Sequence, residues 1–157
     1  MEEAIEDLKE LAEKQEELAE KTRNEESPGD SLKAEQDALN EEFEEIQERL
    51  DQLDKDNQEL ENPNATMDRT EESESIEQKM NESSDRLGQE KNKKASQQQQ
   101  QAADEMQQMA EQMESMMQQH SEESLEIDMD ALRALLENII DLSFDEEGLM
   151  EALRTTS

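Results

Sequence analysis

The chain has 157 residues, of which 47 are acidic and 15 basic, and its formal net charge is -32 at pH 7. This charge argues against a nucleic-acid interface, which needs a basic surface to neutralise phosphate, and against direct contact with anionic lipid heads. With 30% hydrophobic residues, two aromatic residues and no cysteine, the chain offers little material for a broad globular core and none for a disulfide. No run approaches the roughly 20 apolar residues of a membrane span, so we expect this segment itself to make no membrane contact.

The first 61 residues predict two helices that are separated by Ser27-Pro28-Gly29, a sequence typical of a turn. From Leu32 to Leu60, apolar residues recur at alternating intervals of three and four, which places them along one narrow stripe of a helix. Two singly striped helices joined by a short turn favour an antiparallel hairpin over residues 1–61. The stripe residues that we expect to make its interactions are Leu39, Phe43, Ile46, Leu50 and Leu53.

Two polar residues, Gln36 and Asn57, fall on this stripe. A polar residue at such a position costs stability and can fix the register of the paired helices. The alternative, that both are simply tolerated near helix ends, is equally compatible with the sequence.

Asn62-Pro63-Asn64 ends the second helix, because the residue before a proline is pushed out of the helical region, and we expect a linker over residues 62–66. A long Gln- and Met-rich helix is predicted for residues 67–120. Its apolar pattern nearly disappears between 91 and 101, so we expect a weak joint there. A stutter in the heptad repeat would restore the register across this joint.

Residues 121–157 differ in character, because their apolar face is wide and strongly hydrophobic. Ser143 and Glu146 match a capping box, so we predict two short apolar helices in a compact end. The residues of this face that we expect to interact are Leu132, Leu136, Ile139 and Ile140. The expected fold is therefore all-α, with extended antiparallel coiled-coil hairpins and a short, compact helical C-terminal end.

One cluster could bind a soft metal, since thioethers prefer Cu(I) and a spacing of three residues places two of them on one helix face. Its candidate ligands are Met106, Met109, Met113, Met116 and His120. The four methionines also follow the heptad pattern, where methionine commonly fills an adaptable core. We therefore predict no metal site and no cofactor, and we expect His120 to end the long helix, where a cation suits the helix dipole.

Nothing in the sequence predicts catalysis. The single histidine has no cysteine or positioned nucleophile beside it, and paired carboxylates need a concave apolar pocket to shift their pKa values. We therefore expect no enzymatic activity and no catalytic residue. The crowded carboxylates are expected to repel one another, which would raise their pKa values and make stability fall as pH rises.

Two passages resemble a known family. The run 131–145, which reads ALRALLENIIDLSFD, and Lys-Lys-Ala-Ser-Gln at 93–97 are similar to an internal coiled-coil segment of the large Bacteroidetes proteins of unknown function that carry N-terminal membrane helices. The resemblance implies a periplasmic part of a membrane-anchored envelope protein, and it implies that the chain is a fragment. It carries over no catalytic residue.

These observations predict a non-catalytic helical scaffold or protein-interaction segment. Its partner would be another protein or the remainder of the parent chain, with self-association possible. Two alternatives stay open: a Cu(I)-binding module through the Met-rich helix, and an acidic segment that folds on a basic partner.

Overall fold

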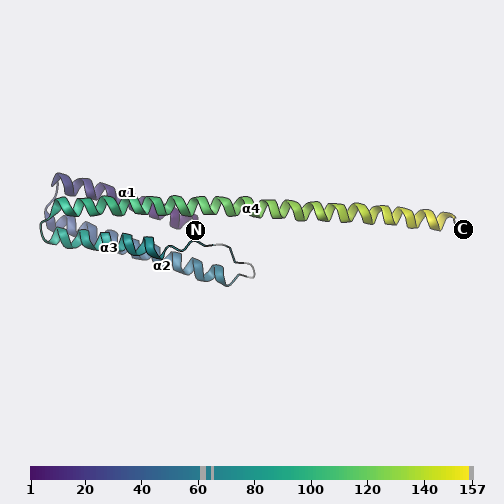
Figure 1. Cartoon of the computed structure of the whole chain (residues 1–157), viewed down its shortest axis with the longest axis horizontal. Helices are drawn as coiled ribbons and strands as arrows, with labels where there is room; N and C mark the ends of the chain where they lie inside the picture. The colour runs from purple at the N-terminus through teal and green to yellow at the C-terminus, as the bar shows by residue number, and fades with distance from the viewer. Residues whose placement is uncertain (61–62, 65, 156–157) are drawn as a thin grey trace. The chain divides into compact units, whose positions relative to one another are not determined.

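The computed structural model describes residues 1–60, 63–64 and 66–155, and all regular structure in this part of the chain is α-helical. The expectation of an all-α fold is confirmed. The chain divides into two units, Met1–Met117 and Gln118–Ser157. Its helices are α1 (Glu2–Asn24), α2 (Gly29–Gln58), α3 (Thr70–Gly88) and α4 (Asn92–Thr155), labelled in Figure 1.

The predicted N-terminal hairpin is confirmed by α1 and α2, which run antiparallel. At the end of α1, Glu25 adopts a left-handed conformation with φ of 55°, and its N–H bonds the carbonyls of Lys21 and Thr22. This cap reverses the chain direction within a few residues. Three ion pairs join the helices in reversed order: Asp7 with Arg49 at 2.6 Å, Lys14 with Glu42 at 2.7 Å and Lys21 with Glu35 at 3.2 Å.

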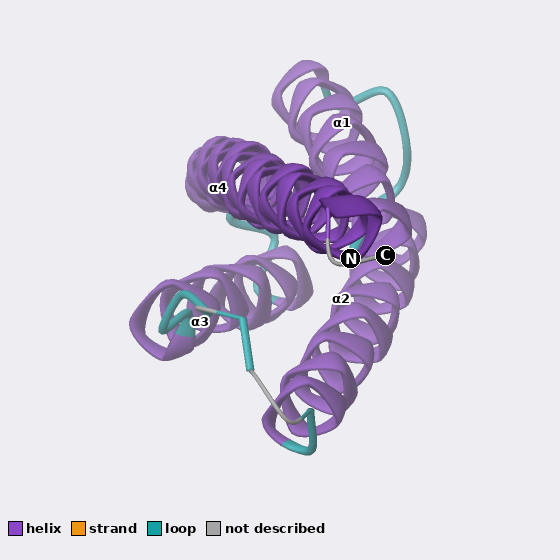
Figure 2. Ribbon diagram, turned by 90° about the vertical axis from the view of Figure 1, so that its right-hand side faces the viewer, coloured by secondary structure: helices purple, strands orange, loops and turns teal. Residues whose placement is uncertain are grey.

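The first unit is an up-down-up-down four-helix bundle that α3 and the first part of α4 complete (Figure 2). Contacts on every side of it pair early residues of one helix with late residues of its neighbour, as antiparallel packing requires. They are Ser84 with Asp37 between α3 and α2, Ser75 with Glu105 between α3 and α4, and Lys9 with Glu114 between α1 and α4.

Each helix contributes one apolar stripe to the core of this bundle. A narrow stripe cannot form a core alone, but four stripes that face one another can. The largest fully buried side chains are Leu8, Leu11, Leu18, Leu32, Phe43, Leu50, Ile76, Met80, Leu87, Met106, Met109 and Met113.

The prediction of one helix over 67–120 is wrong, because α3 ends at Gly88 and α4 begins at Asn92. Between them Glu90 takes a left-handed conformation with φ of 56°, and the Lys91 N–H bonds the Arg86 carbonyl at 2.9 Å. This bond and the left-handed residue close a tight reversal, which places α3 and α4 side by side in the bundle. The weak joint expected at 91–101 is therefore helical from Asn92 onward, and the register restarts at the break without a stutter.

The connection between α2 and α3 is longer than the expected 62–66 linker. It begins after Gln58 and ends before Thr70, while positions 61, 62 and 65 of that expectation lie outside the described residues. Asn57 is not a core residue: its side chain donates to the Asn64 carbonyl at 2.8 Å and accepts from the Asn64 N–H at 2.9 Å. These two bonds tie the connection back to the end of α2.

The prediction of two short helices in 121–157 is also wrong, because α4 continues without interruption through His120 and Ser143 to Thr155. The expected capping box does not form. Instead, the Ser143 hydroxyl donates to the Ile139 carbonyl one turn earlier, at 2.9 Å, a bond that serine makes inside a helix. Of the residues that this prediction included, the side chains of 123–124, 126–128, 145, 149 and 151–155, and residues 156–157 as a whole, lie outside the described part.

Candidate interaction surfaces

The interaction residues predicted on α2 are buried within the chain itself. Leu39, Phe43, Ile46 and Leu50 lie in the bundle core, and Leu53 packs against its edge half-buried. Their partners are therefore α1, α3 and α4, and their side chains are not available to a separate protein.

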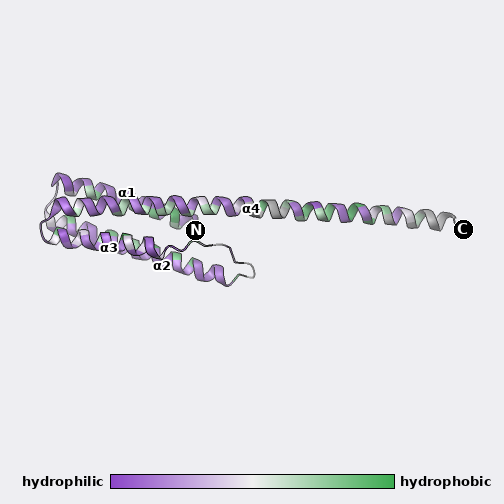
Figure 3. Ribbon diagram, viewed as in Figure 1, coloured by the Kyte–Doolittle hydropathy of each residue, from purple (hydrophilic) through white to green (hydrophobic). Residues whose placement is uncertain are grey.

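The interaction residues predicted near the C-terminus are exposed. Leu132, Leu136, Ile139 and Ile140 are 50–56% exposed, and further hydrophobic residues follow along the same helix, whose ribbon is coloured by hydropathy in Figure 3. Long apolar side chains at this exposure are unusual when they are contiguous, because a soluble monomer seldom leaves a large apolar patch in water. The additional exposed members are Leu125, Met129, Leu135, Leu142, Phe144 and Met150.

Most of the candidate metal ligands are core residues. Met106, Met109 and Met113 are at most 1% exposed, and Met116 is half-buried. His120 is half-buried on the continuing helix and does not end it. Within the residues that the structure describes, His, Cys, Asp and Glu form no group of three or more that could hold a metal ion. The methionines occupy the heptad positions of α4 that face the other helices.

A layer of buried glutamines crosses the bundle. Gln15 of α1, Gln36 of α2 and Gln99 of α4 are fully buried. Gln15 and Gln36 exchange two amide hydrogen bonds at 2.8 and 2.9 Å, and Gln99 donates to the Gln36 carbonyl oxygen at 2.9 Å. Gln36 also donates to Asn40 at 2.9 Å. Because buried amides are costly when unpaired, the layer favours the one alignment in which these side chains meet.

The third glutamine of this layer, Gln99, is buried at a position that the sequence pattern did not single out. It lies in the Gln-rich run that was interpreted as a joint. The heptad of Met106 and Ala102, continued backward, nevertheless reaches Gln99 and then Ala95, which is also fully buried. The core positions of α4 therefore run through the Gln-rich segment without a stutter.

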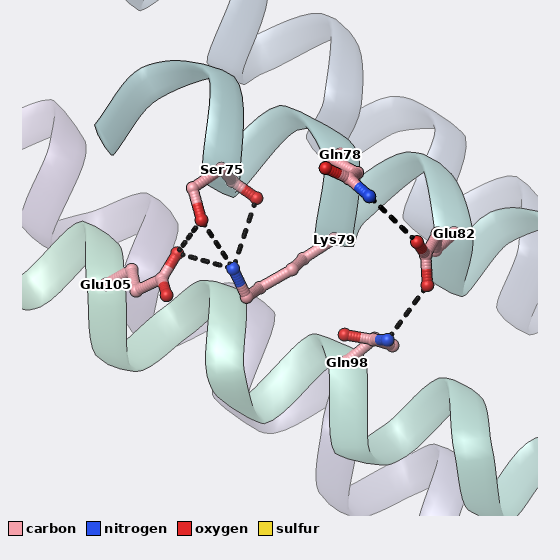
Figure 4. Close-up of polar contacts among 6 residues, drawn as sticks. All are labelled: Ser75, Gln78, Lys79, Glu82, Gln98 and Glu105. Carbon is pink, nitrogen blue, oxygen red and sulfur yellow. Dashed lines mark hydrogen bonds and ion pairs between the residues drawn. The ribbon is translucent and has the colours of Figure 1, made fainter. Parts of the chain in front are cut away.

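Polar contacts also fix α3 against α4 (Figure 4). The Lys79 ammonium lies 2.5 Å from the Ser75 hydroxyl and 3.0 Å from Glu105 of α4, so it bridges the two helices. One turn further, Glu82 accepts hydrogen bonds from Gln78 at 3.1 Å and from Gln98 of α4 at 2.9 Å.

Repulsion between crowded carboxylates is expected to raise their pKa values, but the carboxyl pKa shifts in the bundle are downward. Hydrogen bonds from Gln78 and then Arg86 lower the pKa of Glu82. Burial opposes ionisation of Asp37, but hydrogen bonds from Lys33 and Ser84 outweigh it and lower the pKa of that carboxyl. Hydrogen bonding to Thr70 likewise lowers the pKa of Asp68. The hydrogen bond that Lys14 donates to Glu42 raises the pKa of Lys14. All four shifts therefore favour the charged form of the side chain.

A cavity of about 470 Å³ lies where α2 meets the segment before α3. Arg69, whose side chain is 6% exposed, forms an ion pair of 2.5 Å with Asp54 at this place. Asp51, Asp68 and Glu74 also line the cavity. The ion pair fastens the start of α3 to α2, and the acidic walls make the cavity unsuited to an anion.

No family model, curated protein or solved structure matches the chain. Among the described residues, no helix is both long and apolar enough to cross a membrane.

Proposed function

We propose that the chain is a non-catalytic helical scaffold that presents the apolar face of its C-terminal helix to a protein partner. The observation that carries the proposal is the row of large apolar side chains on α4, exposed by 50–67%. Complete burial of one such side chain contributes about 1.5–3 kcal/mol, so a partner that covers several of them would gain substantial binding free energy.

The non-catalytic part of the proposal is supported by the electrostatics of the bundle. A carboxyl group that acts as a general acid needs a raised pKa, which burial in an apolar pocket supplies. The carboxyls with resolved shifts, Asp37, Asp68 and Glu82, shift downward and form hydrogen bonds that hold them charged. Charged carboxylates of this kind accept hydrogen bonds that hold neighbouring helices together.

The alternatives are less well supported. A chain that folds only on a basic partner would not need the buried Gln15–Gln36 amide pair, which joins two of its own helices. A Cu(I) module would have to bring the metal to Met106 and Met109, which are buried among other helices. From the resemblance of residues 131–145, we also propose that the chain belongs to the periplasmic part of an envelope protein, which fractionation of cells expressing the tagged parent protein would test.

Binding to helical peptides tests the proposed scaffold function. The immobilised full chain is exposed to a panel of helical peptides that each carry an apolar stripe but differ in flanking charge. We expect the wild type to retain some of them and the Leu136→Asp/Ile139→Asp variant to retain none. The matched control is Glu45→Gln/Glu48→Gln, which changes two exposed residues of the bundle and should bind as the wild type does. Equal binding by the Leu136→Asp/Ile139→Asp variant would contradict the proposal.

A further inference from the structure

The apolar face of α4 has the heptad spacing of a coiled-coil helix. Its central row recurs at intervals of four and three residues, which aligns the side chains along one side of the helix. The residues of this central row, each exposed by between 52% and 62%, are Leu125, Met129, Leu132, Leu136 and Ile139. The same intervals continue to Ser143 and Glu146, which are polar, so the apolar row ends before Ser143.

Apolar residues also flank the central row on both sides. Leu135 lies beside one edge and Ile140 beside the other, and they are 58% and 50% exposed. In a parallel, in-register pair of helices, the residue just before a row position lies against the residue five positions later on the other helix. Leu135 of one copy would therefore contact Ile140 of the other, and the symmetry of the pair would repeat this contact on the opposite edge. Both flanks thus match at the spacing that a second copy requires.

The acidic residues of this segment lie away from the central row. At 100° for each residue, Asp130, Glu137 and Asp141 are about 120–160° round the helix from it. Two copies that pair through the row would keep these carboxylates on their outer sides. Among the described side chains of the apolar stretch, the charged one at a flanking position is Arg133. The described charges therefore give no preference for a basic partner and place no carboxylates in the interface of two copies.

Arg133 distinguishes the two possible orientations of such a pair. In the antiparallel alignment that overlaps the whole central row, the symmetry axis passes residue 134, so the Arg133 side chains of the two copies would lie side by side. Like charges at that distance repel. In a parallel pair the two Arg133 side chains lie on opposite edges of the interface, which favours the parallel orientation.

The face is large enough for a stable pair. The burial of one large apolar side chain corresponds to about 60–120 Å² of apolar surface. The central row together with Leu135 and Ile140 supplies seven such residues from each copy, all at least 50% exposed. Two copies would therefore remove about 800–1,700 Å² from water, which overlaps the roughly 1,200–2,000 Å² of specific interfaces. A pair with two-fold symmetry needs this one surface alone.

We propose that the apolar face of α4 between Leu125 and Leu142 pairs with the same face of a second copy, as a parallel two-stranded coiled coil in register. This pairing rests on the proposed scaffold function and identifies its protein partner. Because each copy carries a net charge of -32, the apolar contact forms against charge repulsion, which salt screens. The pair should therefore strengthen with added salt, whereas binding of a basic partner would weaken.

Sedimentation equilibrium of the full chain tests the pairing. Between about 1 and 100 µM, we expect a monomer–dimer equilibrium whose dissociation constant falls at least about threefold when salt rises from about 50 to 500 mM. Leu136→Asp/Ile139→Asp should remain a monomer throughout. The matched control Ala134→Asp/Asn138→Asp adds the same charge at two exposed positions on the far side of α4, and it should still form the dimer.

A cysteine substitution tests the parallel register, because the chain has no cysteine of its own. Ser143 continues the central row, so in a parallel, in-register pair the thiols of Ser143→Cys meet each other at the Cα separation of about 4.4–6.8 Å that a disulfide needs. Mild oxidation should give a disulfide-linked dimer. Asn138→Cys, on the far side of α4, should give little of it at the same concentration. A dimer in which Ser143→Cys forms no more disulfide than Asn138→Cys would reject the parallel register.

Other outcomes would overturn the pairing. A chain that stays monomeric but retains helical peptides, and loses them in Leu136→Asp/Ile139→Asp, would keep the scaffold function and reject the second copy. A monomer that retains no peptide would reject both. A dimer that persists in Leu136→Asp/Ile139→Asp would place the interface elsewhere, and a trimer or larger oligomer would reject the two-stranded pair. A dimer that weakens with added salt would show that attraction between charges, and not the apolar face, holds the copies together.

Discussion

Leu50 and Leu136 are the same residue type on similarly striped helices, yet one is 2% and the other 54% exposed. Leu50 lies in α2, whose three neighbours come from the same chain, and the buried amide layer joins α2 to α1 and α4. In the described part of Gln118–Ser157, no element of that unit covers the apolar face. An apolar stripe therefore predicts a helix and a packing contact, but it does not show whether the contacting helix belongs to the same chain.

The largest expected effect is a matched pair of truncations. Leu50→Ala should destabilise the chain by about 2–5 kcal/mol, because it removes buried methyl groups and leaves a cavity. Leu136→Ala should change stability by no more than about 0.5 kcal/mol, as for other surface substitutions. Urea unfolding followed at 222 nm measures both, and similar losses in the two variants would erase the contrast between the regions.

The glutamine layer gives the next largest effect. Gln36→Leu should cost about 1–3 kcal/mol, because it leaves the amides of Gln15 and Gln99 buried without their partner. The triple variant with leucine at all three positions should recover that loss, since no buried amide then remains. The midpoints of urea unfolding of the wild type, Gln36→Leu and the triple variant test this prediction. If Gln36→Leu matches the wild type, the layer does not stabilise the bundle.

Much of the bundle follows from residue spacing alone. The intervals of three and four predict α1, α2 and the stripe of α3 through Ile76 and Met80, because a helix has 3.6 residues per turn. The break at 89–91 was not predictable from composition, since it depends on Glu90 adopting a left-handed conformation that glutamate seldom takes. Gly88 indicates a weak point in the helix, but the chain reverses there because α3 and α4 then pack against each other.

The candidate interaction surfaces show the same contrast between what residue spacing predicts and what helix packing decides. The sequence identifies Leu132 and Ile139 as apolar positions of one face, and the structure adds that they are exposed. The heptad pattern gives no information on Arg69, a charged residue just before α3 that is buried and forms an ion pair with Asp54 of α2. Interactions between distant residues are set by the packing of whole helices, and local patterns do not contain them.

The methionines of α4 should tolerate conservative change. Replacing Met106, Met109 and Met113 together with leucine nearly conserves core volume, so each change should cost less than about 1.5 kcal/mol and helicity should be kept. Circular dichroism and a Cu(I) titration are recorded on the same samples. A tight Cu(I) signal in the wild type that the triple variant loses would restore the metal hypothesis.

A smaller gain is expected at the end of α1. Glu25→Gly should stabilise the bundle by about 0.5–1 kcal/mol, because φ is 55° there and glycine adopts that conformation without the steric cost of a Cβ atom. The control Glu26→Gly lacks the positive φ and should be neutral or destabilising. Thermal midpoints of the two variants test this pair, and equal shifts would contradict the left-handed cap.

The smallest expected effect is a pH dependence at Asp37. Because hydrogen bonds lower the pKa of Asp37 in the folded state, its contribution is complete above the unfolded value of about 3.9 and is lost as pH falls through the folded value. The difference in melting midpoint between wild type and Asp37→Asn should therefore be constant from pH 7 to about pH 5 and shrink below about pH 4. A difference that grows on acidification would show the opposite sign of shift.

Hydrogen exchange along α4 tests the central claim most directly, because one helix contains both regions. The full chain is labelled at a concentration where light scattering shows a monomer, and exchange is read by mass spectrometry in fragments from 92–117 and 118–150. Amides of the bundle fragment should exchange at least about 100-fold more slowly, since they open only with the bundle, whereas a helix without neighbours opens locally. Equal protection on both sides of Met117 in the monomer would show that the chain itself covers the apolar face, and would contradict the account.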